Sequence, residues 1–339
     1  MTKLFRHAAG LCLAGLMAAG ASQAAADTIN LRISSYAPAG NFINDEIISG
    51  WMDRVVADSE GTITYQLFPG GTSGRNPAEQ LRLVQDGIAD IAFVIPGFTP
   101  GAYDGYGVIE LPGLAESAVE ASMILGEAYA DGLLDTPDRT RVLGVWSSDM
   151  NRIHLRAPIA SLADMSGHTF RANGVPASMA VRSLGGAPVT GLTSTEVAEG
   201  LSRGTIDGAV MGSASLTAFR GGEITTMHIR APMGSSALML PINLGTWNKL
   251  PDVAKAAFEK HGGVGFSQFA GEIMIKHDDA AFNELVEMSG HSEFPFEGAV
   301  AEEALAKLAT VGIEWVAANP NRQAIYDHAV ATVERLRGQ

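Results

Sequence analysis

The chain has 339 residues, of which 46% are hydrophobic and 18% are charged, and its formal net charge is −14. This length and apolar content are enough to bury one or two hydrophobic cores. The acidic balance argues against a protein that binds nucleic acid or an anionic membrane, because both need basic surface. We interpret the acidity as a feature that keeps the protein soluble.

The N-terminal segment is typical of a secretory signal peptide. Lys3 and Arg6 give it a basic start, and the apolar run AAGLCLAGLMAAGA is short for a membrane span. Ala24 and Ala26 form an A-x-A cleavage site, which predicts a mature chain that begins at Asp27. An uncleaved membrane anchor is the alternative. We therefore expect export to the periplasm.

The single cysteine, Cys12, lies inside this segment, and no lipobox surrounds it. The mature chain would then have no disulfide, no thiol nucleophile and no metal site built on cysteine. Such an exported protein must be held together by its core alone.

After the signal segment, strands alternate with helices. TINLRISSY alternates as a strand does, and FINDEIISGWMDRVVADSEG has apolar residues at helical spacing. Thr193 or Ser194 can cap the helix that contains Glu196. Strands separated by one helix favour parallel βαβ units, and the length suggests two α/β domains. The further predicted strands are 62–68, 88–95, 142–146, 168–171, 187–191 and 206–211; the further predicted helices are 77–87, 175–185, 193–204, 251–262, 267–290, 302–320 and 322–338.

No catalytic motif is present. The sequence has no G-x-S-x-G, no P-loop and no H-E-x-x-H. The stretch KHDD, residues 276–279, offers metal-ligating side chains, but on a long helix we interpret it as a solvated charged face. We therefore expect neither an enzyme nor a cofactor or metal site.

The stretch GHTFRANG places Arg171 at the end of a predicted strand, beside a polar turn. Ligands of α/β sheets bind at this end of the strands. A guanidinium offers paired N–H donors that match the two oxygens of a carboxylate. Taken from the residues alone, two interpretations stay open, a ligand anchor or a structural salt bridge to Asp164 or Glu196.

Four stretches resemble the periplasmic solute-binding subunits of tripartite ATP-independent (TRAP) transporters, the DctP family. They cover the chain in order from about residue 30 to residue 300. The stretches are SEGTITYQLFPGGTSG followed by EQLRLVQDGIADIAF, LADMSGHTFRA, LGGAPVTGLTSTEVAEGLSRGTIDGA and LGTWNKLPDVAKAAFEKHG.

This resemblance implies a periplasmic binding protein-like α/β fold, in which two α/β lobes close around a ligand cleft and C-terminal helices pack behind them. The implied segments are 1–26 for the signal peptide, 27–148 plus 237–276 for lobe I, 149–236 plus 277–305 for lobe II, and 306–339 for the C-terminal helices.

The resemblance also implies roles for particular residues. Arg171 matches the family arginine that binds the ligand carboxylate, and Arg152 matches a second arginine of many members. Arg156 aligns instead with a basic residue that does not bind the ligand. The implied partners are a small organic acid and the membrane subunits of the transporter. A monomer is the implied state.

Three positions depart from the polar residues that some sugar-acid binders have. They are Tyr36 after the first strand, Ile95 after the strand IADIAFV, and Met211 in IDGAVM, where many members have asparagine. Such a wall would leave sugar hydroxyls without partners. We expect an acid with an apolar or aromatic body, such as a hydrophobic 2-oxo acid or an aromatic acid. Ordinary packing is the alternative.

Arg75, Asn76 and Phe98, on loops expected to face the cleft, could complete the pocket. Two other functions stay open. A receptor that serves a sensor or another type of transporter would use the same cleft. An exported enzyme on this scaffold would need a nucleophile near Arg171, and the nearest candidates, Ser213 and Ser215, have no evident partner.

Overall fold

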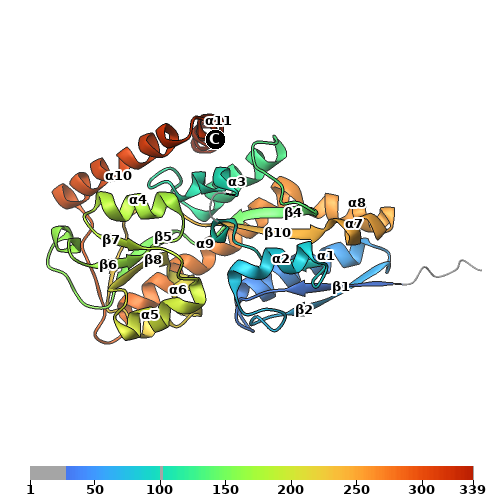
Figure 1. The fold of residues 1–339 in the computed structure, drawn as a ribbon, viewed down its shortest axis with the longest axis horizontal. Coiled ribbons are helices and arrows are strands. Elements are labelled where there is room, and N and C mark those ends of the chain that lie inside the picture. The colour runs from blue at the N-terminus through green and yellow to red at the C-terminus, as the bar shows by residue number, and fades with distance from the viewer. Residues whose placement is uncertain (1–27, 100–101, 339) are drawn as a thin grey trace, which may run out of the picture.

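The structure is a computed structural model that describes residues 28–99 and 102–338. The signal peptide predicted over residues 1–26 lies outside the described residues. Figure 1 shows two β-sheets side by side, each flanked by helices, with the last two helices running over α4 (Val175–Ser183) and α3 (Ala118–Ala130) toward the middle of the molecule. The predicted α/β fold with two lobes and C-terminal helices behind them is confirmed.

The first sheet combines strands from the start of the chain with one strand from much later. Its strands, in spatial order, are β2 (Ile63–Phe68), β1 (Ile29–Ser34), β3 (Ile91–Ala92), β10 (Ala237–Asn243) and β4 (Thr140–Ser147). β1 pairs in parallel with β2 and β3, because helices connect these strands. β10 runs antiparallel to β3 and β4.

The strand β3 is shorter than the predicted strand 88–95. Only Ile91 and Ala92 form its ladder, and Val94 adds an isolated bridge to Met239. The Asp90 carboxylate accepts the backbone N–H of Arg32 at 2.9 Å. Near the start of the predicted strand, the backbone N–H of Arg32 in β1 is therefore bonded to the Asp90 side chain.

The second sheet has the spatial order β11 (Ser292–Glu293), β9 (Met227–Ile229), β5 (Asn151–Leu155), β8 (Gly208–Gly212), β6 (Thr169–Arg171) and β7 (Ala187–Val189). β6 pairs in parallel with β7 and β8, as the pattern predicts. β5 is antiparallel to β8 and β9. The pattern did not predict β5, β9 or β10. Because β10 and β5 pair antiparallel with their neighbours, each sheet is mixed rather than purely parallel.

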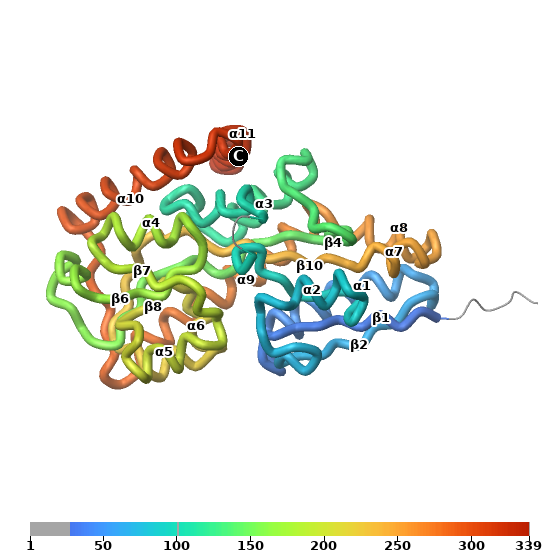
Figure 2. The backbone as a smooth tube through the Cα atoms, in the orientation of Figure 1, coloured from blue at the N-terminus to red at the C-terminus, as the bar shows by residue number. Residues whose placement is uncertain are grey.

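The chain crosses between the sheets three times, from β4 to β5, from β9 back to β10, and from β10 through helices to β11. Figure 2 traces β4 and β10 next to each other toward the middle of the molecule. The long helix α9 (Gly263–Glu287) packs against β4 of the first sheet and against β9 and β11 of the second. The predicted lobe boundary between residues 276 and 277 falls inside this helix.

Most of the helices lie near predicted segments. Besides α9, the helices are α1 (Gly50–Asp58), α2 (Gln80–Gln85), α3 (Ala118–Ala130), α4 (Val175–Ser183), α5 (Val197–Arg203), α6 (Ser213–Ala218), α7 (Leu244–Lys249), α8 (Asp252–His261), α10 (Gly298–Ala318) and α11 (Gln323–Arg337). Of these, α3, α6 and α7 fall where no helix was predicted. α10 packs on α4 and α11 packs on α3. None of the helices within 28–99 and 102–338 combines the length and apolar character that crossing a bilayer requires.

A local sequence signal explains where α5 begins, and α1 has an irregular start. The 3-10 turn Ser194–Glu196 before α5 has a capping box, in which the Thr193 side chain and the Glu196 carboxylate each satisfy a backbone N–H. The predicted cap at Thr193 is therefore confirmed. A π-helical segment, Ile43–Ser49, leads into α1, so the predicted helix 42–61 consists of two parts.

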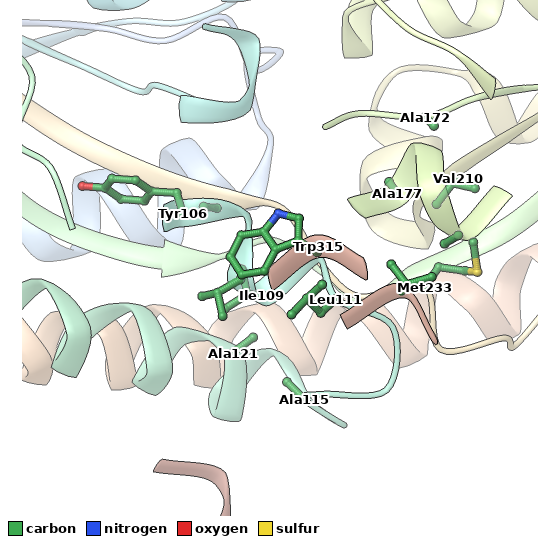
Figure 3. Packing of buried hydrophobic residues seen from close by; sticks show 14 of the residues in the cluster. Tyr106, Ile109, Leu111, Ala115, Ala121, Ala172, Ala177, Val210, Met233 and Trp315 are labelled. Atoms are coloured by element: carbon green, nitrogen blue, oxygen red, sulfur yellow. The ribbon is translucent and has the colours of Figure 1, made fainter. Parts of the chain in front are cut away.

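One apolar cluster ties the two sheets to the C-terminal helices. Trp315 of α10 is fully buried, and Figure 3 shows it close to Ile109 and Leu111, with Met233 and Val210 farther along the same cluster. The middle of the molecule, where the chain crosses between the sheets, is therefore a packed apolar region shared by both sheets and the C-terminal helices.

Candidate ligand-binding site

Arg171 is the last residue of β6, between β7 and β8. It is aligned with Val189 of β7 and Ala209 of β8. The residue is buried, with 3% of its surface exposed, and it lines a cavity between the two sheets. The strand end predicted from GHTFRANG thus brings the guanidinium to the carboxyl edge of the parallel strands.

Two backbone carbonyls orient the Arg171 guanidinium. Its Nε donates to the Leu192 oxygen at 3.2 Å, and its Nη1 donates to the Val210 oxygen at 3.3 Å. Burial lowers the pKa of Arg171 to about 10, which leaves it charged at neutral pH. Among the residues described, no carboxylate lies within salt-bridge distance of it.

The carboxylates considered as salt-bridge partners are used elsewhere. Asp164 accepts backbone N–H groups of Ser161 and Ala160 at 2.8 and 3.0 Å. Glu196 accepts the backbone N–H and the hydroxyl of Thr193 at 2.8 and 2.6 Å. Both cap 3-10 turns, so neither neutralises Arg171.

The cavity beside Arg171 has a volume of about 40 Å³. Residues of both sheets line it. From the first-sheet side come Tyr36, Ala37, Asn41, Phe42, Ile43, Phe93, Ile95, Ser236 and Leu238, and from the second-sheet side and the crossing come Ser148, Asn151, Arg171, Asn173, Ser194, Met211, Gly212, Ala214, Ser215, Ala218 and Phe219.

Aromatic rings form one wall of this cavity. The Tyr36 ring stacks on Phe93 with centroids 4.8 Å apart and on Phe219 at 6.1 Å. Phe93 stacks in turn on Trp146 at 5.6 Å. Tyr36 and Phe93 follow strands of the first sheet, whereas Phe219 follows α6 of the second lobe. The stack therefore joins the two lobes beside the cavity.

Three of the predicted pocket residues lie in this cavity together with Arg171. Tyr36, Ile95 and Met211 all line it, with exposed fractions of 4, 6 and 4%. Burial raises the pKa of the Tyr36 hydroxyl well above its usual range, so the residue stays neutral.

The other predicted residues lie outside it. Arg75 and Asn76 are exposed and line neither this cavity nor its neighbour, and the Asn76 side chain caps the turn before α2. Phe98 lines a second, neighbouring cavity. Arg152 in β5 points to Asp278 of α9, with Nη2 and Oδ2 3.8 Å apart.

Arg152 belongs to a buried acidic cluster behind the cavity. Asp149 accepts the Ser215 hydroxyl at 2.6 Å and the Ser215 backbone N–H at 3.0 Å. Asp278 accepts the Met150 N–H at 3.1 Å. Burial, together with the nearby Asp149, raises the pKa of Asp278 to about 7. Arg152 thus stabilises charge at the crossing between the sheets.

Sequence reasoning missed several lining residues. Phe93 lies in a predicted strand, where an apolar residue is expected in the core, so nothing set it apart. Phe219 lies in a segment without a predicted element. Asn173 stands two residues after Arg171 in the quoted stretch GHTFRANG, and that position was the signal that could have identified it.

A chain of three histidines, scattered in sequence, backs the wall at Met211. His154 Nε2 lies 3.1 Å from the Met211 carbonyl oxygen and therefore donates to it. His154 Nδ1 lies 2.8 Å from His228 Nδ1, and His228 Nε2 lies 3.0 Å from His291 Nδ1. This arrangement fits three neutral rings, and burial lowers the pKa of His228 to about 4.

The stretch KHDD does not gather its side chains. Lys276 and His277 both contact Glu46, at 3.1 and 2.7 Å, whereas Asp278 turns inward to the cluster behind the cavity. Within the described part of the chain, no group of three or more His, Cys, Asp or Glu side chains is placed to hold a metal ion.

Known proteins share this sequence pattern and fold. YiiZ of Salmonella typhimurium, a protein named as uncharacterized, is 29% identical over 189 residues, which are 53% of this chain and 57% of YiiZ. The chain therefore spans little more than half the length of that relative in the match.

Two solved structures have the same fold over nearly their whole length. A TRAP solute-binding protein from an unidentified marine microbe, described as specific for aromatic acid ligands and bound to 3-hydroxybenzoate, has a TM-score of 0.83 and 23% identity. A TRAP solute-binding protein of Rhodoferax ferrireducens, bound to copurified benzoate, has a TM-score of 0.82 and 22% identity. In each comparison 91% of this chain and 98% of the other chain are covered.

A family model described as bacterial extracellular solute-binding protein, family 7, DctP, matches residues 33–313. The resemblance noted in the four sequence stretches is therefore confirmed. Because the model spans most of the chain, this protein belongs to the DctP family of extracellular solute-binding proteins.

Proposed function

We propose that the protein is the periplasmic solute-binding subunit of a TRAP transporter, and that it captures an organic acid whose carboxylate is bound by Arg171. The observation that carries this proposal is a buried guanidinium, oriented by two carbonyls, that lines a cavity and has no carboxylate partner among the described residues. A charge buried in this way is costly, and the ligand would supply the missing opposite charge.

The body of the ligand would be apolar or aromatic. Tyr36, Phe93 and Phe219 present stacked rings to the cavity, and Ile95 and Met211 add aliphatic surface. Hydroxyl groups placed against these side chains would lose hydrogen bonds to water, at about 1–3 kcal/mol each. The aromatic acids bound by the two similar structures support this class of ligand.

Closure of the lobes would follow from contacts that the ligand makes to both sides. We propose that the crossings from β4 to β5 and from β9 to β10 act as the hinge between lobe I (27–148 and 237–276) and lobe II (149–236 and 277–305). An acid held between Arg171 of lobe II and Tyr36 of lobe I would favour the closed form, because only differential affinity shifts such an equilibrium. The closed protein would then dock on the membrane subunits.

Thermal-shift screening of residues 27–339 against a panel of organic acids tests this function. A ligand that binds only the folded state adds about 2.7 kcal/mol of stability at one hundred times its Kd. We expect aromatic or hydrophobic acids to stabilise the protein and Arg171→Ala to lose that response. Arg156→Ala, which also removes one positive charge but lies outside the cavity, is the matched control and should keep it.

Three results would count against the proposal. Stabilisation of Arg171→Ala by the same acids would remove the anchor. A strong preference for multi-hydroxylated sugar acids would contradict the apolar wall. A full panel without any stabilising acid would overturn the ligand class itself.

A further inference from the structure

A second cavity lies next to the first and is the larger of the two, with a volume of about 400 Å³. Asn173 lines both cavities, so the two meet at this side chain. The second cavity is walled by large apolar groups, among them Phe98, Tyr103 and Trp315. Figure 3 shows Trp315 in the packed region between the lobes. An apolar chain that passed Asn173 would find matching surface here.

One buried carboxyl group lines this apolar cavity. Glu110 is 4% exposed, and its Oε2 has no hydrogen-bond partner among the described residues. Two glycines leave room for this group, because neither carries a side chain. A Cβ atom at Gly174 would lie 1.8 Å from Glu110 Oε2, and a Cβ atom at Gly97 would lie 3.4 Å from both Glu110 Oε1 and Asn173 Nδ2. The carboxyl group therefore lies close to the residue that joins the cavities.

The protonation state of Glu110 makes it a hydrogen-bond donor. Burial raises the pKa of Glu110 to about 8, with Arg171 acting to lower it and Asp104 to raise it. Most of the molecules thus carry a neutral carboxylic acid at this position at neutral pH. A buried polar group without a partner is unfavourable, and a ligand oxygen within reach would remove that cost.

We propose that the second cavity receives the far end of a ligand whose carboxylate is bound by Arg171, and that Glu110 hydrogen-bonds an oxygen at that end. This inference rests on the proposed function and narrows its substrate class. The preferred ligands are acids with an apolar body that extends past Asn173 and with a hydroxyl or carbonyl group at the opposite end from the carboxylate.

Titration calorimetry with three matched probes tests this assignment. The probes are 4-phenylbutanoate, its para-hydroxyl derivative and its para-aminomethyl derivative. We expect the hydroxylated acid to bind the wild type about tenfold more tightly than the plain acid, which corresponds to one charge-neutral hydrogen bond. Glu110→Gln, which can still donate and accept, should keep this advantage, and Glu110→Leu should abolish it while leaving the affinity for the plain acid unchanged.

The possible failures can be told apart. Equal affinities of the wild type for the plain and hydroxylated acids, with Arg171→Ala losing both, would overturn the inference and leave the proposed function standing. Tightest binding of the aminomethyl acid would also overturn it, because the partner of Glu110 would then be a cation. No binding of any acid to the wild type would overturn both.

A second variant keeps the test decisive if Glu110→Leu does not fold. Thr190 is exposed on the rim of the second cavity, so Thr190→Trp would narrow the cavity without disturbing the core. We expect this variant to weaken the hydroxylated acid about tenfold and to leave benzoate unaffected. Ala187→Trp, on the exposed edge strand β7 and outside both cavities, is the control. Unchanged affinity of Thr190→Trp for the long acid would contradict the proposal.

Discussion

The two sides of the ligand cavity differ in chemistry. The second-sheet side presents Arg171, and its guanidinium is oriented by carbonyls of its own lobe. The first-sheet side presents rings, with Tyr36 and Phe93 stacked 4.8 Å apart. One lobe therefore offers a fixed charge and the other an apolar face. In the proposed function, Arg171 determines whether an acid binds at all, and the rings determine which acid binds best.

The same contrast continues behind the cavity. The core of the first lobe packs aromatic rings against one another. The ring centroids of Trp146 and Trp51 lie 5.5 and 5.2 Å from that of Phe266. In the second lobe, the cavity wall is backed by His154 and His228, both fully buried. A change in packing should therefore affect the first lobe most, and a change in pH the second.

The largest expected effect is at the charged side. Arg171→Ala should weaken binding of every carboxylate ligand by at least about a hundredfold, because losing one partner of a buried pair costs about 3–5 kcal/mol. Arg171→Lys keeps the charge but not the paired donors, so its affinity should lie between those of the wild type and the alanine variant. Calorimetric titration measures both. An alanine variant within tenfold of the wild type would show that the charge is dispensable.

A pH effect on stability should come from the second lobe. His228 has an ordinary pKa of 6.5, and burial lowers its pKa in the fold to about 4. Burial also raises the pKa of Glu110 to about 8 and that of Asp278 to about 7, which acts in the opposite direction, so the expected change is that of His228 alone. The unfolded chain binds the His228 proton more readily, so the contribution of His228 to stability falls as the pH drops from about 6.5 to 4 and levels off below that. We expect a loss on the order of 2 kcal/mol.

Urea unfolding at several pH values measures this loss. His228→Phe should remove this part of the pH dependence, and His168→Gln, at a half-buried position outside the histidine chain, serves as the control that keeps it. A stability difference between the wild type and His228→Phe that does not change between pH 7 and pH 4.5 would contradict the role of His228.

A packing change should act on the first lobe alone. A Cβ atom at Gly144 would lie 2.2 Å from the ring of the buried Phe266, so Gly144→Ala overpacks the core at a cost of about 1–3 kcal/mol. Gly50→Ala, in α1 with nothing nearer than 3.9 Å, is the matched control and should be neutral or stabilising. Denaturant midpoints would show the difference, and equal midpoints for the two variants would refute it.

The smallest expected effect is at the aromatic side. Tyr36→Leu removes a stacked ring and keeps an apolar side chain, so it should weaken aromatic acids by about threefold to tenfold relative to aliphatic acids. Competition between benzoate and an aliphatic acid of similar size measures this selectivity. If both acids lose affinity to the same degree, the ring serves packing rather than recognition.

Much of the molecule followed from local sequence. The helices at 251–262, 267–290, 302–320 and 322–338 appear near their predicted bounds, because apolar spacing alone specifies a helical face. The position of Arg171 at a strand end also followed, since the strand and the turn after it are local features. The three predicted wall residues Tyr36, Ile95 and Met211 line the same cavity as Arg171.

Other predictions depended on orientation, which local pattern does not contain. The strand pattern of β5 does not show which partner Arg152 has. Asp278 lies beside it only because of where α9 packs. Arg75 and Asn76 lie on a loop whose direction depends on the capped turn before α2. The role of these three residues in ligand binding stays a prediction.

By itself the sequence determined the α/β alternation, the capped turn before α5 and the arginine at the strand end, because each depends on residues a few positions apart. The tertiary structure alone decided that Phe219 stacks against Tyr36, that His154 meets His228, and that Glu110 Oε2 lies near Asn173 with no hydrogen-bond partner among the described residues. Each of these arrangements brings together residues that are far apart in the sequence. Their geometry follows from how the lobes pack, which no local periodicity encodes.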